Sequence, residues 1–171
     1  MKKILTVLLS VYVAIVLFLP KEQIVYTALN TLQKELVSFE IEDFSDYGVV
    51  ANASGISVIY DSMRVAKIED AKIIALLFYN RVDINLLSPA GNFANMLDAK
   101  VYKATISEVF YDPFVLKIDA DSSIGNITGS FDIATSKLRV LIKPNASFSS
   151  FKYKNYFRKT REGYLYEAVI K

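Results

Sequence analysis

Apolar and polar residues alternate along much of residues 38–147, and this alternation constrains the fold more than any other feature of the sequence. A period of two predicts β-strands that turn one face to apolar surroundings and the other to water. Turn signals such as Ser54-Gly55 and Pro144-Asn145 separate the strands at intervals of about 8–12 residues, which favours antiparallel strands over βαβ units. The side chains predicted to share the apolar face of the sheet are Phe114, Leu116, Ile118, Ile127, Phe131, Ile133, Leu138, Val140 and Ile142.

The N-terminus begins with Lys2 and Lys3 and continues as an apolar run that ends before Pro20. The sixteen residues of this run, from Ile4 to Leu19, would form about 24 Å of helix, less than the roughly 30 Å hydrocarbon core of a bilayer. We expect an uncleaved signal anchor, because no small residues mark a cleavage site; a cleaved signal peptide and a buried core helix are the alternatives. The residues chosen to represent this anchor are Ile4, Leu8, Val13, Val16 and Leu19.

The positions of the two lysines predict an orientation for this anchor. Positive charge before the span places the N-terminus in the cytoplasm and exports the rest of the chain. We therefore expect a single-pass inner-membrane protein whose remaining residues lie in the periplasm. Residues 21–37 then read as an amphipathic helix, with Ile24, Ala28, Leu32 and Leu36 at intervals of four. This helix is expected to pack on the following domain; lying along the membrane surface is the alternative.

The last 24 residues differ in charge from the strands before them. Residues 148–171 contain six Lys/Arg and two acidic residues, whereas residues 38–147 carry a net charge of −4. Aromatic side chains are interleaved with these basic residues. We expect a solvated linker and a strand whose aromatic rings cap the sheet, and contact with anionic lipid headgroups or an acidic partner is the alternative. The candidate contacts for an anionic partner are Lys152, Lys154, Arg158, Lys159 and Arg161.

Taken together, these patterns predict a mainly β fold, a curved antiparallel sheet resembling a β-taco or an open barrel. The N-terminal transmembrane helix would continue into, or be followed by, the amphipathic helix. The expected parts are an anchor at 1–20, a helix at 21–37, a periplasmic sheet at 38–147 and a basic aromatic tail with a final strand at 148–171. A strand with Val82, Ile84 and Leu86 on one face belongs to this sheet, while residues 71–79 fit either a helix or a strand.

Composition removes most catalytic chemistry from consideration. The chain has no Cys and no His, which excludes thiolate nucleophiles, Ser-His-Asp triads and nearly all zinc sites. A net charge of +2 is too small for a nucleic-acid binder built on a basic surface. Asp119 and Asp121 share one face of a strand, but the pattern places them on its hydrated side. We expect no enzyme, cofactor or metal site, and a carboxylate-dependent cell-wall enzyme is a distant alternative.

Several segments resemble a known family. They are Gly-Ile-Ser-Val-Ile-Tyr-Asp at 55–61, Ile-Ile-Ala-Leu-Leu-Phe-Tyr-Asn-Arg-Val-Asp-Ile at 73–84, Ile-Gly-Asn-Ile-Thr-Gly-Ser-Phe-Asp-Ile at 124–133 and Leu-Arg-Val-Leu-Ile-Lys-Pro at 138–144. In this order, after a short anchor and an amphipathic helix, they resemble the type II secretion system protein N family and, more distantly, AsmA-like envelope proteins. The periplasmic lipopolysaccharide-transport component C has a similar plan and is the alternative.

That resemblance implies an inner-membrane anchor, a periplasmic curved sheet, and a role in assembling a secretion machine or moving lipid between membranes. It implies no catalytic residues. The function expected from the sequence is therefore a non-enzymatic component of envelope assembly or transport. Its partners would be the inner membrane, other envelope proteins and a lipid held on the apolar face.

Overall fold

The computed structural model describes residues 2–18, 37–76, 79–109 and 111–169. This part of the chain contains one α-helix, α1 (Lys2–Phe18), and three short 3₁₀ helices, η1 (Gly91–Asn95), η2 (Ala146–Ser150) and η3 (Lys154–Tyr156). The rest of its regular structure is β. The strands are β1 (Val37–Glu40), β2 (Asp43–Asp46), β3 (Val50–Tyr60), β4 (Met63–Leu76), β5 (Tyr79–Pro89), β6 (Val101–Val109), β7 (Asp112–Ser122), β8 (Gly125–Asp132), β9 (Lys137–Pro144), β10 (Arg158–Lys159) and β11 (Tyr164–Val169).

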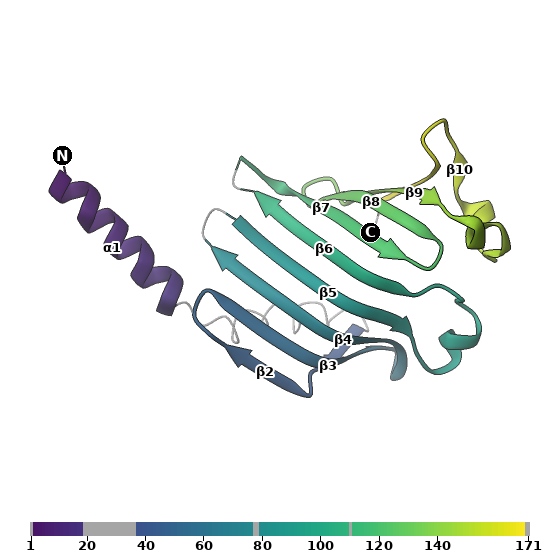
Figure 1. Cartoon of the computed structure of the whole chain (residues 1–171), viewed down its shortest axis with the longest axis horizontal. Helices are drawn as coiled ribbons and strands as arrows, with labels where there is room; N and C mark the ends of the chain where they lie inside the picture. The colour runs from purple at the N-terminus through teal and green to yellow at the C-terminus, as the bar shows by residue number, and fades with distance from the viewer. Residues whose placement is uncertain (1, 19–36, 77–78, 110, 170–171) are drawn as a thin grey trace.

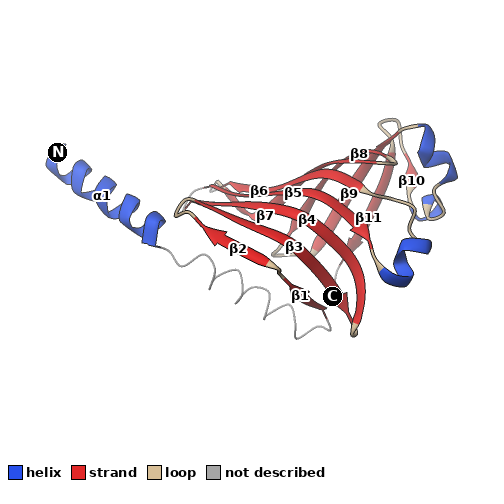
Figure 2. Cartoon of the chain, turned by 60° about the horizontal axis from the view of Figure 1, so that its bottom comes forward, coloured by secondary structure: helices blue, strands red, loops and turns tan. Residues whose placement is uncertain are grey.

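All of these strands belong to one antiparallel sheet (Figure 1). Its order is β1-β3-β4-β5-β6-β7-β8-β9-β11-β10, and β2 pairs with β3 beside β1. The sheet is open, because the described strands at its two edges do not pair with each other. Figure 2 shows that the sheet is strongly curved, with β3 and β4 in front and β9 and β11 behind. The prediction of a mainly β, open antiparallel sheet is confirmed.

The pairing register aligns the apolar side chains into rows that cross the sheet. Because side chains alternate between the two faces of a strand, residues paired across strands point to the same side. These rows define the apolar face. One row is Ala53, Ala71, Ile84, Ala104, Ala120, Ile127 and Ile142, and a second is Ala51, Ile73, Val82, Ile106, Ile118, Gly129 and Val140.

Most of the fully buried core lies in two separate places on this face, while the buried Leu165 of β11 lies on the other face. Core cluster one, at β3 and β4, has Ala53, Ile56, Ile68 and Ala71 at its centre. Core cluster two lies where β7 meets β8 and along β9, with Ile124, Ile142 and Phe148 at its centre. Between the clusters, every described apolar-face side chain of β6 and β7 that lies within the two rows is only half-buried. The middle of the face is therefore less covered than its flanks.

The alternation predicted for β5 is wrong at Leu86. This residue has a φ of +49° and its side chain is 40% exposed, whereas Leu87 packs against core cluster one. A left-handed φ changes the direction of the chain and so resets which residues point inwards. Gly55 of β3, with a φ of +62°, lies between the same two rows of paired residues as Leu86. Periodicity alone does not reveal such a shift.

The predicted transmembrane anchor is not supported. Helix α1 ends at Phe18, and its 17 residues span about 26 Å at a rise of about 1.5 Å each. Of the helices in the described residues, none has the length and apolar character that a membrane crossing needs. Within α1, Leu8 and Val13 are exposed, Ile4 and Val16 are part of the helix, and Leu19 lies outside the described residues. The predicted amphipathic helix also lies outside them, apart from its last residue, Val37, which begins β1.

Candidate functional site

The structure brings the predicted apolar residues of β7, β8 and β9 onto one face. The register pairs Leu116 with Phe131, and Phe131 with Leu138. Beyond the end of β8, the Ile133 amide donates a hydrogen bond to the Phe114 carbonyl at 2.8 Å, which continues the same pairing. All nine residues predicted for this face are thus neighbours on adjacent strands, and they extend the two rows that reach β3.

Burial differs strongly among these nine residues. Ile142 is 2% exposed, while Phe114 and Ile133, at one end of the strands, are 61% and 48% exposed. The other six, Leu116, Ile118, Ile127, Phe131, Leu138 and Val140, are half-buried. Removing apolar surface from water stabilises a complex by about 25 cal/mol per Å². This partly covered face can therefore bind an apolar group without any polar chemistry.

Sequence reasoning missed the part of this face that lies on β6. Ala104 and Ile106 continue the rows between β5 and β7, and both side chains are half-buried. The signal was present, since Ala104 and Ile106 alternate with Lys103, Thr105 and Ser107. Alanine at 104 and 120 also places two small side chains next to each other in the middle of the face, so these positions leave more room above the sheet than Leu or Ile would.

At the opposite end of the strands from Phe114, an aromatic segment packs on the apolar face. Phe148, in η2, is 3% exposed, and its ring centroid lies 4.5 Å from that of Tyr164 and 5.9 Å from that of Phe151. Phe151 and Phe157 pack against the same cluster. We call residues 146–157 the aromatic cap. It closes this end of the face by burying rings on Ile142 and Ile127.

The predicted contacts for an anionic partner lie on or next to the aromatic cap, and all are exposed. Lys152 and Lys154 are in the cap itself, and the Lys154 Nζ donates a hydrogen bond to the Ser149 carbonyl at 2.6 Å. Arg158 and Lys159 form β10, and Arg161 follows it. The Phe rings of this segment therefore cover the sheet, while its cations face solvent.

The opposite face of the sheet is polar over β5 to β7, where it carries an ordered charge network; at β9 and β11 it includes Leu141 and the buried Leu165. The Arg81 guanidinium donates two hydrogen bonds from Nε, both 2.9 Å, and one from Nη2, 2.7 Å, to the Asp83 carboxylate. The Thr105 hydroxyl donates a further bond to Asp83 Oδ1 at 2.7 Å. The Arg81 hydrogen bonds, and secondarily that of Thr105, lower the pKa of Asp83 below its ordinary value. The same contact raises the pKa of Arg81.

We predict that Asp83→Asn lowers the free energy of unfolding at neutral pH. The free energy of unfolding of the variant should also fall less than that of the wild type as the pH is lowered. A carboxyl whose pKa is lowered by folding stabilises the fold above its unfolded pKa of about 4. That contribution is lost as pH falls through the lower folded-state pKa. Thermal melts between pH 7 and pH 2 should show the wild type and the variant converging in acid. Asp119→Asn, exposed on the same face, is the matched control, and an unchanged pH profile for Asp83→Asn would contradict the assignment.

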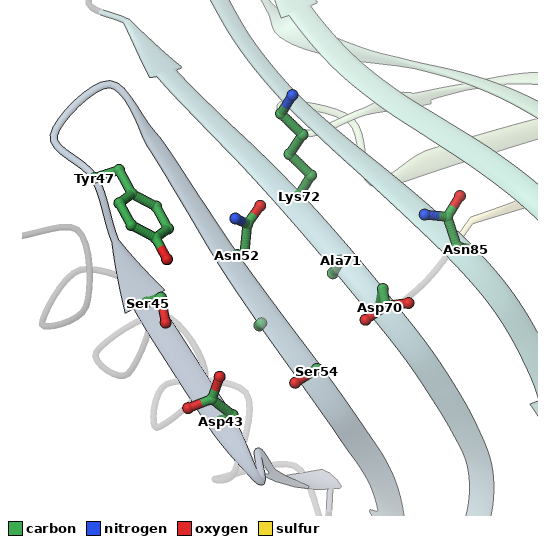
Figure 3. A pocket seen from close by; sticks show the side chains of 10 residues that line it. Asp43, Ser45, Tyr47, Asn52, Ser54, Asp70, Ala71, Lys72 and Asn85 are labelled. Atoms are coloured by element: carbon green, nitrogen blue, oxygen red, sulfur yellow. The ribbon is translucent and has the colours of Figure 1, made fainter.

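Two shallow hollows lie on this polar face. The larger, of about 420 Å³, is bordered by Tyr47, Asn52, Asp70, Lys72 and Asn85, among others (Figure 3). The second, of about 260 Å³, contains both Asp119 and Asp121. The register places Asp121 opposite Lys103 and Asp119 opposite Thr105. Both carboxylates are exposed, as the alternation predicted, and within the described residues no group of three or more acidic side chains could hold a metal ion.

Comparison with known proteins identifies no relative. The chain matches no protein-family model, no curated protein and no solved structure. The site must therefore be interpreted from its own geometry, which provides a half-covered apolar face, a basic cap at one end of that face, and a hydrated polar face on the other side of the sheet.

Proposed function

We propose that this chain is a non-enzymatic component of the cell envelope that holds the acyl chain of a lipid on the middle of its apolar face. One observation carries the proposal. The core is split into two clusters at the flanks of the sheet, and the apolar rows between them, on β6 and β7, are only half-buried. A sheet that needed this face only for its own stability would have it covered along its whole length.

The apolar surface of the middle region supports an acyl chain as the ligand. Its residues Ala104, Ile106, Ile118 and Ala120 are contiguous across β6 and β7 and carry no polar group. An acyl chain makes no directional contacts, so a smooth apolar surface is sufficient for it. Each methylene removed from water contributes about 0.8 kcal/mol, and several methylenes would offset the cost of immobilising the chain.

Helix α1 supports a location at a membrane. Six of its large apolar side chains, Val7, Leu8, Leu9, Val11, Val13 and Ile15, are between 43% and 62% exposed. A helix that is apolar on all sides is stable where it is surrounded by apolar material. We propose that α1 attaches the protein to a membrane, and that the sheet works beside that membrane in secretion-machine assembly or lipid transport.

Photo-crosslinking tests the lipid proposal. A benzophenone amino acid at Ile118, on the apolar face, should capture lipid in cells, and mass spectrometry should identify the adduct. The same amino acid at Lys117, the adjacent residue on the polar face, is the matched control and should capture none. Capture of protein alone at Ile118 would replace the lipid proposal with a docking function, and no capture would contradict both.

A further inference from the structure

One end of the apolar face lies beside a region of uncompensated positive charge. At the cap end of the face, from Ile142 to Arg161, the sequence contains six Lys/Arg and no Asp/Glu. Arg139 and Arg158 share one carboxylate, that of Glu167, at 3.7 and 3.9 Å. Lys152, Lys159 and Arg161 are exposed, and no carboxylate of the described residues lies within ion-pair distance of them. An anion at this end would therefore meet several cations that no carboxylate of the described residues pairs with.

The aromatic cap connects this charge to the apolar face. Its rings Phe148, Phe151 and Phe157 pack on the same cluster as Ile127 and Val140, two residues of the apolar rows. Lys152 directly follows Phe151, and Arg158 directly follows Phe157. Arg158 pairs with Glu167 on the polar side of the sheet, whereas Lys152 is exposed beside the cap. An apolar chain that lay along β6 and β7 towards this end would thus reach rings in a segment that carries exposed cations.

A hollow of about 340 Å³ lies where the cap meets the sheet. Lys100, Ser123, Ser147, Ser150 and Phe151 contribute to its wall, and Asp98 is its one acidic member among the described residues. Hydroxyl and ammonium groups are suitable donors to phosphate oxygens, and a neighbouring apolar ring suits the glycerol and first methylenes of a lipid. This hollow gives a headgroup a place between solvent and the apolar face.

We infer that the lipid is anionic, with a phosphate-bearing headgroup at the basic cap and its acyl chain on the apolar face; the inference rests on the proposed function. Charge complementarity selects this occupant. A neutral lipid would bring no net counter-charge to the cations of the cap, whereas an anionic headgroup would bring one negative charge to them. Near a membrane, each Lys or Arg contributes about 1 kcal/mol of attraction to anionic lipid, and salt screens this attraction.

Two fluorescent lipids with identical acyl chains test the inference on the full-length protein. One has a phosphatidylglycerol headgroup and the other a phosphatidylcholine headgroup. We expect the wild type to bind the anionic probe at least about tenfold more tightly at low salt, and the preference to shrink as salt is added. Inorganic phosphate at matched ionic strength should not displace the probe, because it lacks the acyl chain; displacement would indicate a phosphate site unrelated to lipid.

A charge-neutralised variant identifies the residues involved. K152Q/K159Q/R161Q should lose the preference for phosphatidylglycerol while binding phosphatidylcholine as the wild type does. K67Q/K72Q/K117Q changes the net charge equally through exposed lysines of β4 and β7, and it should keep the preference. Equal loss in both variants, or equal affinity of the wild type for both lipids, would overturn the headgroup assignment alone. Binding of neither lipid by the wild type would overturn the proposed function as well.

Discussion

Replacing Phe148 with alanine should remove about 3–5 kcal/mol from the free energy that holds the aromatic cap on the sheet. Phe148 is 3% exposed, and its ring lies within 6.2 Å, centroid to centroid, of the rings of Phe151, Phe157 and Tyr164. Its loss would leave a cavity at the centre of core cluster two. Chemical denaturation followed by tyrosine fluorescence, together with hydrogen exchange of residues 146–157, should detect the change.

The exposed ring of the same segment provides the control. Tyr156 is 71% exposed, so Tyr156→Ala should change stability by no more than about 0.5 kcal/mol. Because the two core clusters are separate, Phe148→Ala should increase exchange at the cap and β9 more than at β3 and β4. An equal increase in hydrogen exchange across all strands of the sheet would mean that the two core clusters unfold as one unit. Equal effects of Phe148→Ala and Tyr156→Ala would show that the cap contributes little stability.

The strands from β7 to β9 could be predicted from sequence because their alternation is unbroken. Leu116, Ile118 and Ala120 follow each other at intervals of two. Asp112-Pro113 and Gly125 mark the positions where β7 and β8 begin. Short connections then require adjacent antiparallel pairing. Given these two facts, the order of neighbouring strands and the set of residues on the apolar face follow directly.

Other features depend on interactions that a local pattern does not contain. Leu86 has a φ of +49° inside β5, so strict alternation assigned it to the wrong face. Of residues 71–79, those from 71 to 76 belong to β4 and Tyr79 begins β5, although their apolar character also fitted a helix. The degree to which the apolar face is covered depends on which segments pack over it, and this decides whether the face is a core or a site.

The most informative prediction uses four alanines that lie in one row but differ in burial. Ala53 and Ala71 are 3% and 6% exposed inside core cluster one, whereas Ala104 and Ala120 are half-buried in the middle of the face. A larger side chain in a filled core forces its neighbours apart and costs about 1–3 kcal/mol. We therefore expect Ala71→Phe to lower the free energy of unfolding by that amount, and Ala120→Phe to leave it unchanged within about 0.5 kcal/mol.

The two substitutions should have the opposite ranking when lipid binding is measured. A phenyl ring at 120 would occupy the space proposed for the acyl chain, so Ala120→Phe should weaken binding of the phosphatidylcholine probe by about tenfold or more, the equivalent of about two methylenes. Ala71→Phe should retain binding at temperatures where it is folded. Destabilisation by Ala120→Phe equal to that by Ala71→Phe would mean that the middle of the face is already filled by the protein's own side chains. Normal stability with normal lipid binding would instead place the ligand elsewhere, because an open face that accepts a phenyl ring without displacing the lipid cannot be where the lipid lies.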